Sequence, residues 1–244
     1  MLELKNISFS ADGDVGKKEI LKNISVKFEN GFVAITGPNG GGKSTLAKII
    51  AGIEIPDSGS IYLDGEDITG LSVTERANRG ISFAFQQPVR FKGITVSDII
   101  RLSAGRNITV SEACDYLSQV GLCARDYINR EVNASLSGGE LKRIEIASVL
   151  ARGTSVSIFD EPEAGIDLWS FSNLINVFER MRESLGGTII IISHQERILN
   201  IADKVAVISA GELTDYGEKS AVLPKLLDAT YDACRVLKDS LGEA

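Results

Sequence analysis

Apolar and polar residues alternate along residues 1–30 of the chain. The apolar positions with this spacing are Leu2, Leu4, Ile7, Phe9, Ile24, Val26 and Phe28. A period of two is typical of half-buried antiparallel strands, because successive side chains point to opposite faces. The polar residues 11–18 between the two stretches predict a hairpin loop. We therefore expect an N-terminal antiparallel β subdomain.

Five later segments are apolar over almost their whole length. They lie at residues 32–36, 81–85, 156–159, 188–192 and 205–208. Strands that are covered on both faces, as in a parallel sheet, have this composition. Between them, apolar residues recur with helical spacing, as at Leu46, Ile49 and Ile50. This alternation of strands and helices predicts an α/β fold with a doubly wound parallel sheet.

One internal stretch lacks the alternation of strands and helices. Residues 95–128 contain helix-spaced apolar residues, such as Val96, Ile99 and Ile100, but no convincing strand. We expect a helical subdomain, at about residues 87–136, to be inserted into the α/β core. Residues 223–244 have the spacing of an amphipathic helix or pair of helices. We expect this segment to pack on the core rather than on a partner, so that residues 1–244 form a single domain.

Composition and charge exclude several classes of protein. The chain has 26 basic and 33 acidic residues, a net charge of −7, and so lacks the basic surface that broad nucleic-acid binding requires. Its apolar runs are far shorter than the ~18 residues that span a bilayer, and its first residues lack the pattern of a signal peptide. Three cysteines without a C-x-x-C spacing suggest a reducing compartment. We expect a cytoplasmic protein that neither binds nucleic acid nor inserts into a membrane.

A glycine-rich segment between the first apolar strand and the first helix fits the phosphate-binding pattern G-x-x-x-x-G-K-[ST]. Its residues are Gly37, Pro38, Asn39, Gly40, Gly41, Gly42, Lys43, Ser44 and Thr45. Glycines allow backbone N–H groups to turn toward a phosphate, and the following helix directs the positive end of its dipole at the same anion. Lys43 supplies a charge for the β- and γ-phosphate oxygens, and the Ser44 hydroxyl suits Mg²⁺. The segment predicts a nucleoside triphosphate site.

Two acidic residues follow the apolar run at residues 156–159. A carboxylate at this edge of a parallel sheet faces the phosphate site, so we expect Asp160 to hold Mg²⁺ through water. Glu161 then lies next to the γ-phosphate, where it can polarise the attacking water. His194, the single histidine of the chain, follows the run at residues 188–192 at the same edge. A lone histidine is more often structural, but this position favours a catalytic role.

The helix predicted over residues 141–150 is preceded by an unusual turn. After Leu136, its residues are Ser137, Gly138, Gly139 and Glu140. Ser137 and Glu140 have the spacing of a capping box, which is a purely structural explanation. The two glycines destabilise a first helical turn by roughly 1 kcal/mol each, so they suggest that bare N–H groups approach an anion. One ATP cannot reach both this turn and Lys43 within one compact chain.

The order of these motifs over roughly residues 1–220 resembles the ATPase domain of the ABC superfamily. The resemblance rests on the phosphate loop, Gln86, the LSGGE sequence at residues 136–140, Asp160, Glu161, Asp167 and His194. It implies a P-loop NTPase core that hydrolyses ATP with Mg²⁺. It also implies a head-to-tail dimer in which each ATP lies between the phosphate loop of one copy and residues 137–140 of the other. Gln86 would sense Mg²⁺ and the partner, Asp167 would lie at the dimer seam, and His194 would contact the γ-phosphate.

Three short sequences bear on the partner. Residues 84–89 (AFQQPV), 160–167 (DEPEAGID) and 193–199 (SHQERIL) resemble segments of SufC, the ATPase of the SUF iron–sulfur cluster assembly machinery. This resemblance implies a SufB/SufD-like scaffold protein as the partner. The alternative is the ATP-binding subunit of an ABC importer, which would dock on a membrane permease. Ala11 stands where many relatives of the superfamily stack adenine on an aromatic residue, so the adenine contact stays open.

Overall fold

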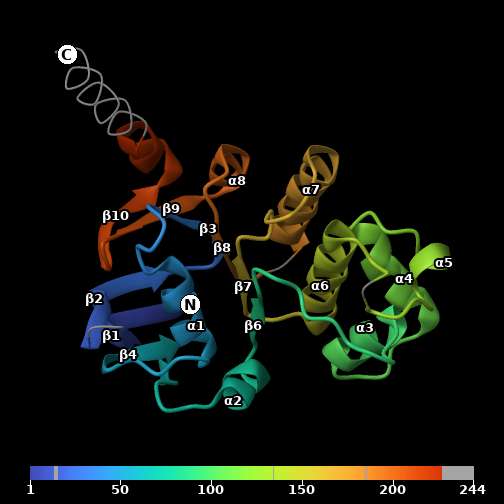
Figure 1. The fold of residues 1–244 in the computed structure, drawn as a ribbon, viewed down its shortest axis with the longest axis horizontal. Helices are drawn as coiled ribbons and strands as arrows, with labels where there is room; N and C mark the ends of the chain where they lie inside the picture. The colour runs from blue at the N-terminus through green and yellow to red at the C-terminus, as the bar shows by residue number, and fades with distance from the viewer. Residues whose placement is uncertain (14–15, 134, 185, 227–244) are drawn as a thin grey trace.

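Two β-sheets and the helices that cover them form the body of the protein, and a group of helices projects at one side (Figure 1). The computed structural model describes residues 1–13, 16–133, 135–184 and 186–226 of the 244-residue chain. The sequence-based prediction of an α/β core with an antiparallel β subdomain is confirmed. Within the described part of the chain, no helix combines the length and the apolar character that crossing a membrane requires.

The smaller sheet is antiparallel and N-terminal. Its strand order is β2-β1-β4-β5, with β1 at Leu2–Gly13, β2 at Gly16–Phe28, β4 at Ser58–Leu63 and β5 at Glu66–Asp67. The hairpin loop predicted at residues 11–18 is wrong in length, because Ala11 pairs with Lys18 and Asp12 with Lys17 inside the strands. These arms are stabilised by polar cross-strand pairs, which leave no apolar alternation to recognise.

The larger sheet has six strands. Its order is β10-β9-β3-β8-β7-β6, with bounds Glu212–Glu218, Lys204–Ser209, Gly31–Thr36, Thr188–Ile192, Val156–Asp160 and Ile81–Ala84. All neighbours are parallel except β10, which runs antiparallel to β9. Because β3, β8 and β7 are adjacent and in register, with Ile35 opposite Ile192 and Asp160 opposite Ile192, their carboxyl ends meet at one edge. That edge carries the phosphate loop, Glu161 and His194.

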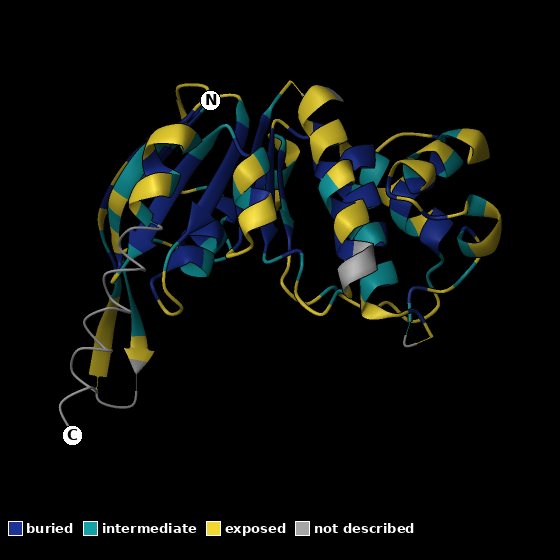
Figure 2. Ribbon diagram, turned by 90° about the horizontal axis from the view of Figure 1, so that it is seen from above, coloured by how far each residue is buried: buried dark blue, intermediate teal, exposed yellow. Residues whose placement is uncertain are grey.

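The central strands β7 and β8 of the larger sheet are buried on both faces, as their continuous apolar runs predict (Figure 2), whereas the edge strand β10 is not. Ile35, Ile158 and Ile190 point into a core shared with α1 and the smaller sheet. Phe159 and Ile191 point into a second core, on the side of α6 and α7. The helices that flank the sheets are α1 (Lys43–Ala51), α2 (Val73–Asn78), α6 (Gly138–Arg152), α7 (Leu168–Ser184) and α8 (Glu196–Ile201).

Three helices lie between β6 and α6 in the chain and project away from the sheets (Figure 1). They are α3 (Val96–Ala104), α4 (Val110–Gln119) and α5 (Ala124–Tyr127). Ile100 of α3 and Leu117 of α4 are buried in one core with Leu141 and Ile144 of α6. The long helix α6 therefore joins this helical group to the sheets. Of the helix predicted at residues 223–244, residues 223–226 are helical and the rest lie outside the described residues.

Candidate nucleotide site

The glycine-rich segment forms a tight loop between β3 and α1, as predicted. Gly37 has a φ of 132°, and a Cβ atom at this position would lie 2.0 Å from the carbonyl oxygen of Ile208. Gly42 has a φ of 103° and stands at the N-cap of α1. Only glycine tolerates this combination of left-handed backbone and close approach. The loop therefore brings the exposed N–H groups at the start of α1 to the edge of the sheet, which is a suitable arrangement for an anion.

Lys43 lies in the first turn of α1 and is folded over the loop. Its Nζ atom donates to the carbonyl oxygens of Gly37 at 2.8 Å and Pro38 at 2.9 Å. The residue is only 5% exposed. Burial lowers the pKa of the Lys43 ammonium group, while Glu161 and Asp160 oppose that shift. A buried cation beside free N–H groups gives the loop the electrostatics of a phosphate site.

Ser44 and Asp160 place two oxygen atoms side by side. The Ser44 hydroxyl donates to Oδ1 of Asp160 at 2.9 Å, which joins the first turn of α1 to the end of β7. Asp160 is 4% exposed, and burial raises the pKa of its carboxyl group against the hydrogen bond from Ser44. Among the described residues, no group of three or more His, Cys, Asp and Glu side chains could hold a metal. A hydroxyl and one carboxylate fit a hard cation that keeps water and phosphate oxygens as its other ligands.

The side chain of Glu161 contacts residues from two other loops, Gln86 and His194. Its Oε2 atom accepts a hydrogen bond from Nε2 of Gln86 at 2.5 Å, and its Oε1 atom lies 3.7 Å from Nε2 of His194. The backbone of Glu161 is left-handed, with a φ of 43°, which is a strained conformation for this residue type and one often found at functional sites. Burial and the charge of Lys43 lower the pKa of His194. The charge of Glu161 opposes this shift, and the lowered pKa favours the neutral imidazole.

The turn that carries His194 is held by a residue that the sequence analysis did not single out. The hydroxyl of Ser193 donates to Oε1 of Glu163 at 2.5 Å and accepts the N–H of Gln195 at 3.0 Å. Burial raises the pKa of the Glu163 carboxyl group. This contact joins residues 30 positions apart in the chain, and no local pattern indicates it. Glu163 thereby fixes the backbone on both sides of His194.

A cavity of about 480 Å³ lies at the phosphate loop, and neither Asp160 nor His194 lines it. It is lined by residues 39–45, Gln86, Glu161, Lys18 and Ile20. The sequence analysis missed both Lys18 and Ile20: Lys18 fell within residues 11–18, which were assigned to a loop, and Ile20 was not singled out. In the structure they lie in β2, beside the phosphate loop. Ala11 lies opposite Lys18 in the neighbouring strand β1. Neither residue of this cross-strand pair is aromatic.

The turn at residues 137–140 does not line this cavity. It forms the predicted capping box, because the Ser137 hydroxyl accepts the N–H of Glu140 at 3.3 Å and Oε2 of Glu140 accepts the N–H of Ser137 at 2.6 Å. The second carboxylate oxygen of Glu140 accepts a hydrogen bond from the Tyr127 hydroxyl. Asp167, which directly precedes α7, does not line the cavity either. One copy of the chain thus contains two separate places suited to an anion.

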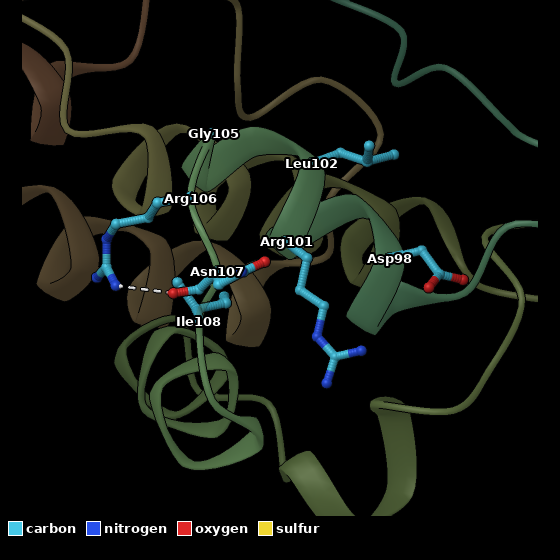
Figure 3. A pocket seen from close by; sticks show the side chains of 7 residues that line it. All are labelled: Asp98, Arg101, Leu102, Gly105, Arg106, Asn107 and Ile108. Atoms are coloured by element: carbon cyan, nitrogen blue, oxygen red, sulfur yellow. Dashed lines mark hydrogen bonds between the residues drawn. The ribbon is translucent and has the colours of Figure 1, made fainter.

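A cavity of about 960 Å³ lies along α3 and the segment that follows it (Figure 3). It is lined by Asp98, Arg101, Leu102 and residues 105–108. Its Arg106 is paired with Glu112 at 2.9 Å. The cavity holds none of the predicted site residues, so we place the candidate site at the phosphate loop.

Comparisons with known proteins agree with this placement. The sequence pattern of the ABC transporter family matches residues 21–164. An uncharacterised ABC transporter ATP-binding protein of Methanocaldococcus jannaschii is 39% identical over 216 residues, which cover 85% of this chain and 86% of that protein. The spermidine/putrescine import ATP-binding protein PotA of Fusobacterium nucleatum is 35% identical over 99% of this chain and 62% of its own length.

The fold is also similar to that of solved ATP-binding cassettes. One of them, a dimeric cassette in a post-hydrolysis state bound to ADP and Pi, has a TM-score of 0.80 and 24% identity, and the match covers 90% of this chain and 99% of that one. The family match spans more than half of the chain and includes the phosphate loop, Gln86, residues 137–140 and Glu161. The chain therefore belongs to the ABC transporter family, and it is an ATP-binding ABC ATPase.

Proposed function

We propose that the chain is the ATP-hydrolysing subunit of an ABC transporter and works as a head-to-tail dimer. The observation that carries this proposal is the division of the anion-binding features between two places. The cavity at Lys43 is lined by Ser44, Gln86 and Glu161, and Asp160 and His194 adjoin it through their contacts with Ser44 and Glu161. The capped turn at residues 137–140 does not line it. A second copy can bring its turn to the first copy's cavity, which completes two equal sites by symmetry.

In each site, the chain's own residues bind and orient the phosphates of ATP. Lys43 and the loop N–H groups hold the β- and γ-phosphates, and Ser44, Asp160 and Gln86 hold Mg²⁺, directly or through water. When bound there, Mg²⁺ would supply positive charge that offsets the negative charge of the phosphates. Glu161 accepts a hydrogen bond from the attacking water and polarises it, while neutral His194 donates to the γ-phosphate. The left-handed backbone at Glu161 keeps the carboxylate pointed into the cavity.

The second copy contributes the N-terminus of its α6. Both carboxylate oxygens of Glu140 are engaged within the chain, by Ser137 and by Tyr127. Glu140 therefore shapes the turn, and the contacts with the nucleotide come from the Ser137 hydroxyl and the N–H groups of Gly138 and Gly139. Asp167 lies at the dimer seam. The related cassette that was solved with ADP and Pi is described as dimeric, which supports the same assembly here.

Adenine binds at the corner of the cavity formed by Lys18 and Ile20. No aromatic ring is available at Ala11, so the base packs on the Ile20 side chain and on the aliphatic stem of Lys18. Such a surface gives a weaker and less selective contact than aromatic stacking.

A membrane permease is the first candidate for the partner. The relative PotA is named as the ATP-binding protein of a spermidine/putrescine importer. In addition, a groove of about 260 Å³ opens between α2, β6, α3 and α6, and Phe83 and Phe85 lie in it with their rings 4.9 Å apart. An apolar groove next to Gln86 suits a helix of a partner, because movement of the partner then reaches the nucleotide site.

A SufB/SufD-like scaffold is the second candidate, favoured by the SufC-like sequences at residues 84–89, 160–167 and 193–199. Affinity purification of the full chain from native lysate, with identification of the bound proteins, separates the two. A multi-span permease in the membrane fraction supports the transporter. Recovery of a soluble scaffold protein with iron–sulfur cluster ligands instead overturns the transporter assignment in favour of cluster assembly.

We expect Phe91→Ala to weaken partner binding by about tenfold or more while leaving basal ATP hydrolysis unchanged. The sequence allows two roles for Phe91: it covers a small core of the helical subdomain, or it lines, with Val89, a groove for a partner helix. In the structure Phe91 is 39% and Val89 49% exposed, and neither lines the groove at Phe83 and Phe85. An exposed aromatic anchor is typical of a binding hot spot. A pull-down titration with the identified partner measures the effect, and Val110→Ala, also exposed in the helical group, is the matched control.

A buried role for Phe91 predicts a different result. Truncation of a buried phenylalanine lowers stability by about 3–5 kcal/mol, which a thermal melt detects readily. A well-folded Phe91→Ala protein with native partner affinity would contradict the surface role.

A further inference from the structure

Lys142 is a buried cation that the proposed chemistry does not use. It lies in α6, five positions after the N-cap Ser137, and its side chain is 1% exposed. Its Nζ atom donates to the carbonyl oxygen of Phe85, to that of Gln86 at 3.3 Å, and to Oε2 of Glu145 at 3.0 Å. All three acceptors lie either in α6 or at the start of the loop that carries Gln86. The ammonium group thus joins the helix to that loop.

Glu145, on the same face of α6, also binds the loop. Its side chain is 16% exposed, and its Oε1 atom accepts the backbone N–H of Phe85 at 3.0 Å. Both backbone hydrogen-bonding groups of Phe85 are therefore bound by side chains of α6. The parallel pairing of β6 with β7 ends one residue earlier, at Ala84 opposite Phe159. The backbone of Phe85 and Gln86 is therefore hydrogen-bonded to side chains of α6 rather than to the sheet.

A buried ion pair is a costly way to attach two segments. Removing two charges from water consumes most of the energy that their attraction returns, so a pair of apolar side chains would stabilise the same contact at least as well. The advantage of the charged pair is geometric specificity, because its hydrogen bonds fix the position of the Phe85 backbone along α6. The next side chain, Gln86, reaches Oε2 of Glu161 at 2.5 Å. A shift of α6 is thus passed on to the contact with Glu161.

We propose that the Lys142–Glu145 pair positions Gln86, and that it links the nucleotide held at one end of α6 to hydrolysis at the chain's own Glu161. This inference rests on the proposed head-to-tail dimer, in which Ser137 contacts the ATP of the second copy. When that ATP draws in the N-terminus of α6, the pair moves the loop, and Gln86 moves with it. Each of the two sites then hydrolyses ATP in response to occupation of the other. Lys142 and Glu145 are positioning residues, because neither touches the nucleotide.

The test compares the wild-type chain with Lys142→Met/Glu145→Met, which removes both charges and leaves no unpaired ion in the core. The Phe85 backbone can then turn to water, since its side chain is already 41% exposed. We expect ATP affinity within about twofold of wild type, a kcat at least tenfold lower, and a Hill coefficient for ATP that falls from above 1 to about 1. Lys142→Arg keeps the cation and its donors, so it should retain kcat within about threefold.

The matched control is Arg79→Gln/Glu66→Gln, which removes an exposed ion pair of 3.0 Å far from the loop. It should leave both kcat and the Hill coefficient unchanged. If the pair only fastens the helical group to the core, the double methionine variant loses melting temperature but keeps the Hill coefficient, and the proposal is overturned. A Hill coefficient of about 1 in the wild type overturns it as well.

Two further measurements keep the interpretation clear. Hydrogen exchange on the wild-type chain should show slow exchange of the Phe85 amide, since Glu145 accepts it, and exchange at the rate of an open loop contradicts the proposed contact even if the variants do not fold. ATP-driven dimerisation is measured separately in the Glu161→Gln background. If Glu161→Gln does not dimerise with ATP, the head-to-tail dimer is contradicted. If it does dimerise but Lys142→Met/Glu145→Met keeps the wild-type Hill coefficient, the role of the Lys142–Glu145 pair is contradicted.

Discussion

Lys43→Ala is expected to abolish ATP binding at concentrations that saturate the wild-type chain. The ammonium group is buried and already lies over the loop, held by the carbonyl oxygens of Gly37 and Pro38. The cavity contains one other lysine, Lys18, which lies in β2 rather than in the phosphate loop. A hydrogen bond to a charged group contributes about 1.5–3 kcal/mol. Loss of two such bonds weakens binding by at least about a hundredfold.

Calorimetric titration with ATP and Mg²⁺ measures this loss. The variant should melt at or above the wild-type temperature, because burial lowers the pKa of Lys43 and alanine removes a charge that is unfavourably placed without a ligand. Lys22→Ala serves as the control, since Lys22 carries the same charge in β2 and is exposed. ATP affinity within tenfold of wild type in Lys43→Ala would show that the loop, rather than the ammonium group, dominates phosphate binding.

The features that could be predicted from the sequence are those with a local cause. The phosphate loop follows from glycines at positions where the backbone must be left-handed, such as Gly42, and its place between a strand and a helix is also local. The strands of the larger sheet are visible because both of their faces are buried, which requires continuous apolar runs such as residues 188–192. The positions of Asp160, Glu161 and His194 then follow from the rule that the carboxyl ends of parallel strands share one edge.

The features that escaped prediction depend on contacts between distant segments. Residues 11–13 and 16–18 belong to the strands β1 and β2, where Asp12 lies opposite Lys17, and composition alone does not reveal this pairing. Lys18 consequently reaches the nucleotide cavity. From the sequence, Lys142 is expected to be an ordinary exposed lysine of a helix. In the structure it donates a hydrogen bond to Gln86, 56 residues earlier in the chain. Such partners become visible only when the topology brings the segments together.

The two anion-binding places also explain why a single chain contains an incomplete site. In one copy, residues 137–140 do not line the cavity at Lys43, and they are capped by their own Ser137 and Glu140. Closure of a dimer over ATP would exclude water from this cavity and strengthen every electrostatic contact with the phosphates. Under the proposed coupling, the same closure would shift α6, and the Lys142–Glu145 pair would pass this shift to the loop that carries Gln86.

Glu161→Gln is expected to bind ATP with native affinity and to hydrolyse it at least about a hundredfold more slowly. An amide cannot act as a general base, and general base catalysis contributes about 10²–10⁴-fold. The amide oxygen can still accept the hydrogen bond that Gln86 donates at 2.5 Å, so the geometry of the site is retained. A steady-state phosphate-release assay measures the turnover, and Glu179→Gln, an exposed residue of α7 with the same change of charge, should retain it. A native rate in Glu161→Gln would assign the reaction to another base.

The same variant should accumulate as a dimer when ATP and Mg²⁺ are present. Each copy carries a net charge of −7, so association is opposed until the phosphates connect the cavity of one copy with Ser137 of the other. Because hydrolysis no longer releases the γ-phosphate, the closed state persists and its population rises. Replacing Glu161 also removes one negative charge next to the γ-phosphate in each site. Sedimentation should show the mass of a monomer without nucleotide and of a dimer with ATP, but not with ADP. A mass that is independent of ATP at concentrations where binding is saturated would contradict the head-to-tail assembly.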